Sequence, residues 1–257
     1  MSAPPGREPR DPNALFEADA DRAGYVRGMF GSIAARYDLM NTLMTGGRHH
    51  AWRRIAARAL VRPGDEVLDV GCGTGDLTFA CLDAGASRVL ALDVALPMLP
   101  LARAKAGRRR IASRAGFAGG DATRLPLPDA AVDAWCSAFV VRNIPDLDAA
   151  LSEAYRVLRP GGRLANLEIT RMKPGPLRPL ARLHFTHVVP VMGRLISGHR
   201  SAYRYLPVSV DHFDAPEEFT ARLERAGFEV TQVRSLMLGT IALHVARKPD
   251  TASVGDG

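Results

Sequence analysis

The sequence has no long apolar run, few cysteines and few aromatic residues. No apolar stretch of the 257-residue chain approaches the roughly 20 residues that a membrane-spanning helix needs, which excludes a transmembrane protein. The first 21 residues are polar and proline-rich and lack the apolar core of a signal peptide. The three cysteines, Cys72, Cys81 and Cys136, form no CxxC pair, so we expect a reduced, cytoplasmic protein without a disulfide framework.

Lysine is also scarce, although the chain carries a net charge of +7. Of the 34 basic residues only three, Lys105, Lys173 and Lys248, are lysines. The arginines are spread along the chain except in residues 103–114, where they are dense. Nucleic-acid-binding surfaces usually concentrate basic residues and interleave aromatic ones, so we expect no nucleic-acid partner. Two interpretations of residues 103–114 stay open: a solvated helix end and loop, or contact with an anionic membrane surface.

The overall composition, 47% hydrophobic and 24% charged residues, is that of an ordinary globular protein. The length suits one large domain that can bury a sizeable core. We expect a disordered leader over residues 1–22, a single domain over 23–248 and a disordered tail over 249–257. Within the domain, residues 23–62 would form a helical cover and residues 171–207 a substrate-binding insert.

The spacing of apolar residues changes along the chain. Residues 23–60 show helical spacing, interrupted at Gly46-Gly47. Strands are expected at 66–70, 88–93, 116–121, 131–139 and 163–169, alternating with helices at 75–84, 95–106 and 148–158. This alternation predicts parallel βαβ units. A helix at 216–226 and strands at 228–236 and 240–247 close the chain, which predicts an antiparallel last strand.

A glycine-rich turn follows the first expected strand. Gly71 and Gly73 let the backbone turn tightly and approach a ligand, and the helix that follows presents free N–H groups. Asp93 lies 18 residues after Gly75, at the end of the second strand, where a carboxylate can accept both ribose hydroxyls of a nucleoside. Asp121 ends the third strand, where it can accept a proton from an adenine amino group. A tight turn with a capping Asp is the alternative.

Four segments together, VLDVGCGTGDL, ALD, GDATRLPLPD and VLRPGGRL, resemble the class I S-adenosylmethionine-dependent methyltransferases. The resemblance covers residues 62–169 and implies a Rossmann-like α/β fold with a seven-stranded, mostly parallel sheet and helices on both faces. It also implies S-adenosyl-L-methionine as co-substrate. The cofactor-binding residues it suggests are Asp69, Gly71, Gly73, Thr74, Asp93, Asp121, Ala122 and Ser137.

Two further segments, 29–41 with 49–52 and 139–143, resemble the signatures of the ubiquinone/menaquinone biosynthesis C-methyltransferases. That family methylates a ring carbon of a polyprenylated quinol, such as demethylmenaquinol in menaquinone biosynthesis or a benzoquinol in ubiquinone biosynthesis. Two alternatives remain: another small aromatic or lipid acceptor, and a non-catalytic scaffold of a quinone-synthesis complex. The sequence departs from the family at Val140, usually glycine, at Ala138, usually serine, and at Gly46-Gly47, usually Phe-Gly.

Carbon methylation of a quinol is helped by removing a proton from the adjacent hydroxyl, whose pKa resembles the value of about 10 for Tyr. Arg142 is the candidate cation that lowers this pKa, and Asn143 can orient a hydroxyl or a water. Tyr37 and Asp38 could contact the quinol or relay a proton, and His49 could act as a base. A salt bridge for Arg142, and packing and capping roles for Tyr37 and Asp38, are the structural alternatives.

The insert carries an apolar cluster over residues 180–196 that could hold part of an isoprenoid tail or pack on the domain. His184 and His187 lie three residues apart, but no third ligand is evident, so we expect no metal. Because the substrate is lipid-soluble, we expect reversible contact with the inner face of the membrane. Whether the protein forms a homodimer is left open.

Overall fold

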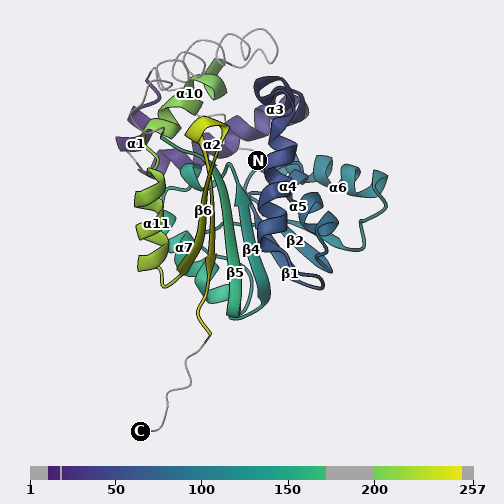
Figure 1. Cartoon of the computed structure of the whole chain (residues 1–257). Coiled ribbons are helices and arrows are strands. Elements are labelled where there is room, and N and C mark those ends of the chain that lie inside the picture. The colour runs from purple at the N-terminus through teal and green to yellow at the C-terminus, as the bar shows by residue number, and fades with distance from the viewer. Residues whose placement is uncertain (1–10, 18, 172–199, 251–257) are drawn as a thin grey trace.

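The computed structural model describes residues 11–17, 19–171 and 200–250, and its centre is a seven-stranded sheet (Figure 1). The strand order is β3-β2-β1-β4-β5-β7-β6. The strands are β1 (Glu66–Val70), β2 (Arg88–Asp93), β3 (Ala115–Gly119), β4 (Val132–Ala138), β5 (Leu158–Ile169), β6 (Glu229–Leu236) and β7 (Ile241–Arg247). Strands β1 to β5 pair in parallel, and β7 runs antiparallel to both β5 and β6. This confirms the mostly parallel sheet with an antiparallel last strand.

Helices cover both faces of the sheet (Figure 1). They are α1 (Ala14–Glu17), α2 (Asp19–Ile33), α3 (Tyr37–Thr45), α4 (Arg48–Leu60), α5 (Asp76–Asp83), α6 (Leu99–Arg108), α7 (Leu147–Val157), α10 (Arg200–Asp211) and α11 (Pro216–Arg225). One buried cluster joins α4, α5 and α6 to the sheet, and a second joins α7 and α11 to the opposite face. Because helices cover both faces, the residues of β1 and β4 are almost continuously buried rather than alternating between buried and exposed.

The N-terminal segment is more ordered than the sequence predicts. The leader was expected to extend to residue 22, but α1 and the start of α2 lie within it. Leu15 is buried in a cluster with Val26 and Met29, and the ring of Phe16 stacks on His212 with centroids 4.3 Å apart. These contacts with distant segments stabilise a helix that the polar, proline-rich composition conceals.

The helical cover has one more break than the sequence predicts. A 3₁₀ turn at Ala34–Arg36 separates α2 from α3, in addition to the expected break at Gly46 and Gly47, which have φ values of +57° and +74°. Helix α10 begins inside the segment 171–207 that was expected as an insert. The apolar cluster over 180–196, with His184 and His187, lies outside the described residues.

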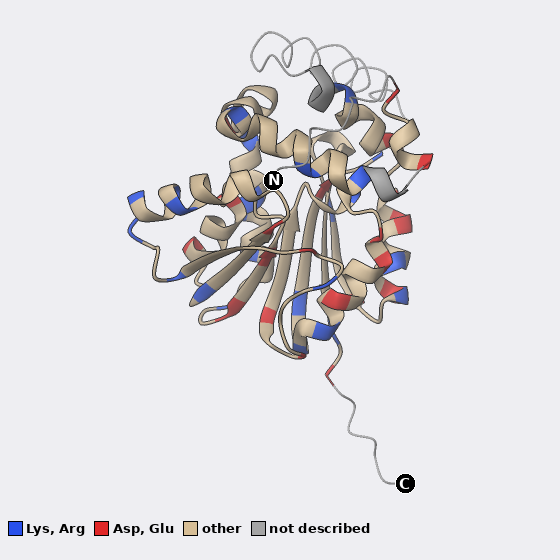
Figure 2. Cartoon of the chain, turned by 180° about the vertical axis from the view of Figure 1, so that it is seen from behind, with Lys and Arg blue, Asp and Glu red and all other residues tan. Residues whose placement is uncertain are grey.

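Basic and acidic residues are interleaved along the strands and the outer helices (Figure 2). In the arginine-rich segment 103–114, three side chains bind groups of the protein itself: Arg103 and Arg114 donate to backbone carbonyls, and Arg109 pairs with Asp83 at 2.7 Å. These contacts favour the interpretation of this segment as a solvated helix end. None of the helices in the described part of the chain is long and apolar enough to cross a membrane.

Candidate active site

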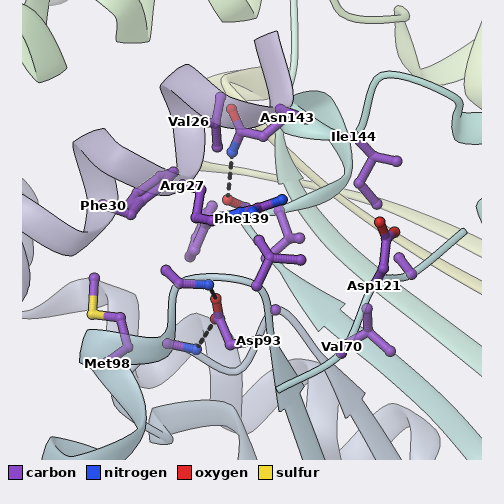
Figure 3. Close-up of a pocket in the computed structure, with 18 of the residues that line it drawn as sticks. Val26, Arg27, Phe30, Val70, Asp93, Met98, Asp121, Phe139, Asn143 and Ile144 are labelled. Atoms are coloured by element: carbon purple, nitrogen blue, oxygen red, sulfur yellow. Dashed lines mark hydrogen bonds between the residues drawn. The ribbon is translucent and has the colours of Figure 1, made fainter. Parts of the chain in front are cut away.

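A pocket opens at the carboxyl ends of the parallel strands, where β1 lies between β2 and β4 (Figure 3). The chain crosses to opposite sides of the sheet after these strands, and ligands of open α/β sheets bind at such a point. The space in and in front of the pocket amounts to about 850 Å³, open solvent included. Its lining includes Val26, Arg27, Phe30, Tyr37, Gly71, Gly73, Asp93, Met98, Asp121, Ala122, Phe139, Val140, Asn143 and Ile144.

The glycine-rich turn forms the floor of the pocket. Gly71 and Gly73 have φ values of +70° and +54°, which L side chains rarely adopt. A Cβ atom on Gly71 would also lie 2.4 Å from the side chain of Val140, and one on Gly73 would lie 3.7 Å from the ring of Tyr37. The turn therefore needs glycine both for its conformation and, at Gly71, for the close approach of a neighbouring side chain.

Asp93 lies at the end of β2 with its carboxylate at the pocket wall (Figure 3). Its Oδ2 accepts a hydrogen bond from the amide of Gly73 and its Oδ1 from the amide of Ala95, each at 2.7 Å. Burial raises the pKa of Asp93, and the two amide donors oppose this effect. The carboxylate is thus held in a fixed orientation, and its remaining lone pairs are available to hydroxyl groups of a ligand.

Asp121 and Ala122 line the opposite side of the pocket, as the resemblance implies for residues near an adenine ring. The Oδ1 atom of Asp121 accepts from the amide and the hydroxyl of Thr123 at 2.9 and 2.8 Å. These two hydrogen bonds fix the orientation of the exposed Asp121 carboxylate at the rim of the pocket.

Three predicted cofactor residues, Asp69, Thr74 and Ser137, are absent from the pocket lining formed by the described residues. Asp69 is fully buried and accepts a hydrogen bond from the hydroxyl of Thr78 at 2.6 Å; burial raises its pKa to about 7. Ser137 donates to Asn166 Oδ1 at 2.8 Å inside the sheet. Asp69 and Ser137 therefore support the turn and the strands from within the sheet. A linear sequence motif does not distinguish such a supporting residue from one that contacts a ligand.

Thr74 instead joins the helical cover to the turn. Its hydroxyl donates to Asp38 Oδ1 at 2.6 Å and accepts from Lys105 Nζ at 2.9 Å. Lys105 also lies 2.6 Å from Asp38 Oδ2 and 3.0 Å from Asp76 Oδ1. This network connects α3 to the beginning of α5 and to α6, so Asp38 acts as an anchor of the cover rather than as a pocket residue.

His49 is buried in α4, outside the pocket lining of the described residues. Its Nδ1 lies 2.6 Å from the guanidinium of Arg53, and its Nε2 lies 3.3 Å from the hydroxyl of Thr42. Since a guanidinium only donates, Nδ1 is the acceptor and the neutral ring carries its proton on Nε2. Burial, Arg53 and His50 lower the pKa of His49 to about 4. His49 therefore lies outside the pocket in which a substrate would bind.

His49, His50 and Asp76 are the one group of potential metal ligands found among the described residues, with ligand atoms within 4.8 Å of one another. Arg53 already occupies the Nδ1 lone pair of His49, and Lys105 pairs with Asp76. These two cations compensate the negative charge that would attract a metal ion. We therefore assign no metal to this group.

Arg142 was predicted to act on the substrate, but the structure directs it into the protein. Its Nη1 lies 2.6 Å from Glu168 Oε1, and both side chains are buried. Nη1 also donates to the carbonyl of Phe139 at 2.8 Å, and Nε lies 3.3 Å from the hydroxyl of Ser209. Glu168 compensates the charge of Arg142. Arg142 thus forms a salt bridge, which is the structural alternative that the sequence left open.

Asn143 and Tyr37, for which the sequence suggests catalytic roles, both line the pocket. Asn143 is 7% exposed, and its amide nitrogen donates a long hydrogen bond of 3.5 Å to the carbonyl of Phe139 (Figure 3). Its Oδ1 has no hydrogen-bond partner among the described residues. This oxygen is almost inaccessible to solvent, so a ligand hydroxyl can satisfy it only when the Asn143 side chain turns toward the cavity.

The sequence did not identify the residues that close the pocket from α2, namely Val26, Arg27 and Phe30 (Figure 3). Their helical spacing marked an apolar face, but that pattern does not tell a face that packs on a core from one that covers a cavity. Other lining residues, including Met98 and Val140, come after β2 and β4. Their position after the predicted strand ends is the signal that could have identified them as pocket residues.

Comparison with known proteins shows which family this chain resembles. The model of the ubiE/COQ5 methyltransferase family matches residues 18–248. The demethylmenaquinone methyltransferase of Thermus thermophilus is 44% identical over 223 residues, which cover 86% of this chain and all of the relative. The ubiquinone/menaquinone biosynthesis C-methyltransferase of Paracoccus denitrificans is 40% identical over 241 residues, 92% of this chain and 96% of the relative.

Among solved structures, a S-adenosylmethionine-dependent methyltransferase from Aquifex aeolicus is similar, with a TM-score of 0.59 and 20% sequence identity. The match covers 82% of this chain and 97% of that protein. At this identity the likeness shows the fold alone, and it confirms the Rossmann-like methyltransferase architecture.

Proposed function

The chain belongs to the ubiE/COQ5 methyltransferase family, and we propose that it transfers a methyl group from S-adenosylmethionine to a ring carbon of a polyprenylated quinol. The relatives named for ubiquinone/menaquinone biosynthesis and for demethylmenaquinone support this acceptor class. One observation carries the proposal. A single pocket combines a polar wall with the fixed carboxylate of Asp93 and an apolar wall with the unpartnered Asn143 acceptor.

The polar wall fits the co-substrate. The carboxylate of Asp93 would accept the ribose hydroxyls, and the backbone of Gly71 and Gly73 leaves room for the methionine part. Asp121 and Ala122 would contact the adenine ring. When bound, S-adenosylmethionine supplies a methyl group on a positively charged sulfur, and the residues of the chain place the acceptor carbon in line with it.

The apolar wall fits the quinol ring. Val26, Phe30 and Ile144 would enclose the ring and exclude water, while Asn143 Oδ1 would accept the hydrogen of a ring hydroxyl. That hydrogen bond strengthens as the hydroxyl oxygen polarises toward the ring, and it fixes which ring carbon faces the methyl group. Tyr37 lies where the polar and apolar walls meet and would border the ring from the cover.

We further propose that the protein contacts the membrane surface through an apolar patch at the carboxyl end of the sheet. The patch consists of Leu39 and Leu43 on α3 and Met237 and Leu238 in the turn after β6, with exposed fractions of 41–70%. Arg48 lies 3.7 Å from the sulfur of Met237, which brings α4 beside this turn. The patch supports membrane contact better than segment 103–114, whose arginines largely bind the protein. Whether the chain forms a homodimer, which the sequence leaves open, is a question that a mass measurement in solution answers.

The test in cells is the quinone that accumulates when the gene is removed. We expect a quinone that lacks one ring methyl group, and we expect the wild-type chain but not an Asp93→Ala variant to restore the methylated form. Unchanged quinones in the deleted strain would contradict the proposed acceptor class.

A further inference from the structure

The pocket narrows at Val140, the residue after Phe139 at the end of β4. Val140 belongs to the pocket lining, and both of its methyl groups would lie 2.4 Å from a Cβ atom on Gly71. Its isopropyl group therefore lies directly against the Cα atom of the glycine turn. The side chain occupies the space between the floor that supports the co-substrate and the wall that carries Asn143.

The backbone holds Val140 in this place. Phe139 has a φ of +65°, a conformation that costs free energy in a residue other than glycine. Its amide donates to the carbonyl of Leu167 at 2.8 Å, and its own carbonyl accepts from Arg142 at 2.8 Å and Asn143 at 3.5 Å. Since Arg142 is in turn paired with Glu168 at 2.6 Å, the turn is held from several sides, which keeps Val140 at the pocket.

From this geometry we infer that Val140 determines which quinol rings the enzyme accepts, an inference that rests on the proposed function. The acceptor carbon must approach the methyl donor across the space that the isopropyl group narrows. A rigid ring system that extends further from that carbon meets Val140 before it reaches the transfer distance. Such a clash between the ring and Val140 lowers kcat/KM, because the ring is not aligned with the methyl donor in the transition state.

The alternative is that Val140 only supports the glycine turn through its contact with Gly71. In that case truncating it would weaken binding of S-adenosylmethionine and lower the rates with all acceptors equally. The two roles are separable, since a support role leaves the ratio of kcat/KM values for two acceptors unchanged.

The experiment uses the purified full chain with a two-ring naphthoquinol and a one-ring benzoquinol that carry the same short prenyl tail and lack the ring methyl group. The variants are Val140→Ala and Val140→Gly. Val140→Ala keeps a Cβ atom that restrains the backbone, so it still tests the inference if Val140→Gly folds poorly. The matched control is Val94→Ala, which truncates a valine of the same pocket on the β2 side. Binding of S-adenosylmethionine is measured separately by calorimetry.

We expect the kcat/KM ratio of naphthoquinol to benzoquinol to rise about threefold in Val140→Ala and about tenfold in Val140→Gly, and to stay at the wild-type value in Val94→Ala. An unchanged ratio in both Val140 variants, or an equal rise in the control, overturns the inference. If the wild-type chain methylates neither quinol, the proposed function fails together with it, whereas turnover with an unchanged ratio contradicts the role of Val140 alone.

Discussion

At the scale of single residues, Asp93 combines two tasks. It accepts the amides of Gly73 and Ala95, which fixes the glycine turn, and it presents a charged acceptor to the pocket. The sequence predicted this residue because an acidic residue at the end of a second strand has a defined place in the fold. It could not predict that the same carboxylate also holds the turn, since that depends on atoms 20 residues apart in the chain.

The first prediction is that Asp93→Asn weakens S-adenosylmethionine binding about 100-fold, on the order of 3 kcal/mol, because the ribose hydroxyls lose a charged acceptor. Asp83→Asn is the matched control, since Asp83 pairs with Arg109 on an exposed surface. Calorimetry measures both affinities. An unchanged affinity in Asp93→Asn would remove Asp93 from the cofactor site.

The second prediction concerns His49, whose pKa is lowered to about 4 by burial and by Arg53 and His50, against the attraction of Asp76 and Asp38. The unfolded chain takes up a proton near pH 6.5, whereas the folded chain does so only near pH 4. The stability from neutral His49 is therefore complete above about pH 6.5 and is lost as the pH falls toward 4.

Replacing His49 with Gln removes this proton uptake. Between pH 7 and 4.5, the free energy of unfolding of the wild type should fall by roughly 2–3 kcal/mol more than that of His49→Gln. Urea unfolding at a series of pH values measures the difference. Parallel curves for the two proteins would show that His49 titrates alike in the folded and unfolded states.

The third prediction separates the two roles considered for Arg142. Because Arg142 is paired with buried Glu168, Arg142→Met leaves an uncompensated carboxylate and should cost about 3–5 kcal/mol of stability. The double variant Arg142→Met with Glu168→Gln should regain at least half of that loss. If instead the single variant is as stable as the wild type and its rate recovers toward pH 10, Arg142 acts on the substrate hydroxyl as the sequence suggested.

At the scale of elements, the sequence predicted most strands to within a few residues, because buried parallel strands are short apolar runs bounded by Gly, Pro or Asp. It missed the 3₁₀ turn at Ala34–Arg36 and the helix Ala14–Glu17, since both depend on contacts with distant segments. It expected a helical cover over residues 23–62, but it did not tell which residues of α2 line the pocket. A helical face of apolar residues gives no information on whether a core or a cavity lies beneath it.

The fourth prediction concerns the apolar patch formed by α3 and the turn after β6. Leu43 and Leu238 are 43% and 70% exposed, so charged replacements there disturb no core. The variant Leu43→Glu with Leu238→Glu should lose most of its sedimentation with vesicles that contain anionic lipid, because apolar insertion and attraction to the lipid both weaken. Val233→Glu, on the exposed side of β6, is the control and should sediment like the wild type.

Equal sedimentation of the double variant and the wild type would show that this patch does not face the membrane. A wild type that does not sediment at low ionic strength would contradict membrane contact altogether, since electrostatic attraction is least screened there.

At the scale of the whole molecule, the strand order decides where the chemistry is located. The segments after β1, β2 and β4 meet at one edge because these strands are parallel neighbours, and α2 closes that edge from above. The sequence predicted the fold, and it pointed to Asp93 and Asp121 at strand ends. Both residues line the pocket, and their contact with the co-substrate stays a prediction. The sequence did not resolve which of Asp69, Thr74 and Ser137 contact a ligand and which support the turn, because that distinction requires side-chain directions.

The most direct test of the central claim is methyl transfer by the purified chain to a demethylated polyprenyl quinol, with S-adenosylmethionine carrying a ¹³C-labelled methyl group. Nuclear magnetic resonance of the product distinguishes a methyl group on a ring carbon from one on oxygen. We predict a ¹³C methyl signal bonded to a ring carbon, abolished in Asp93→Ala. A label found on a hydroxyl oxygen, or no transfer to any demethylated quinol while S-adenosylmethionine binds, would contradict the proposed reaction.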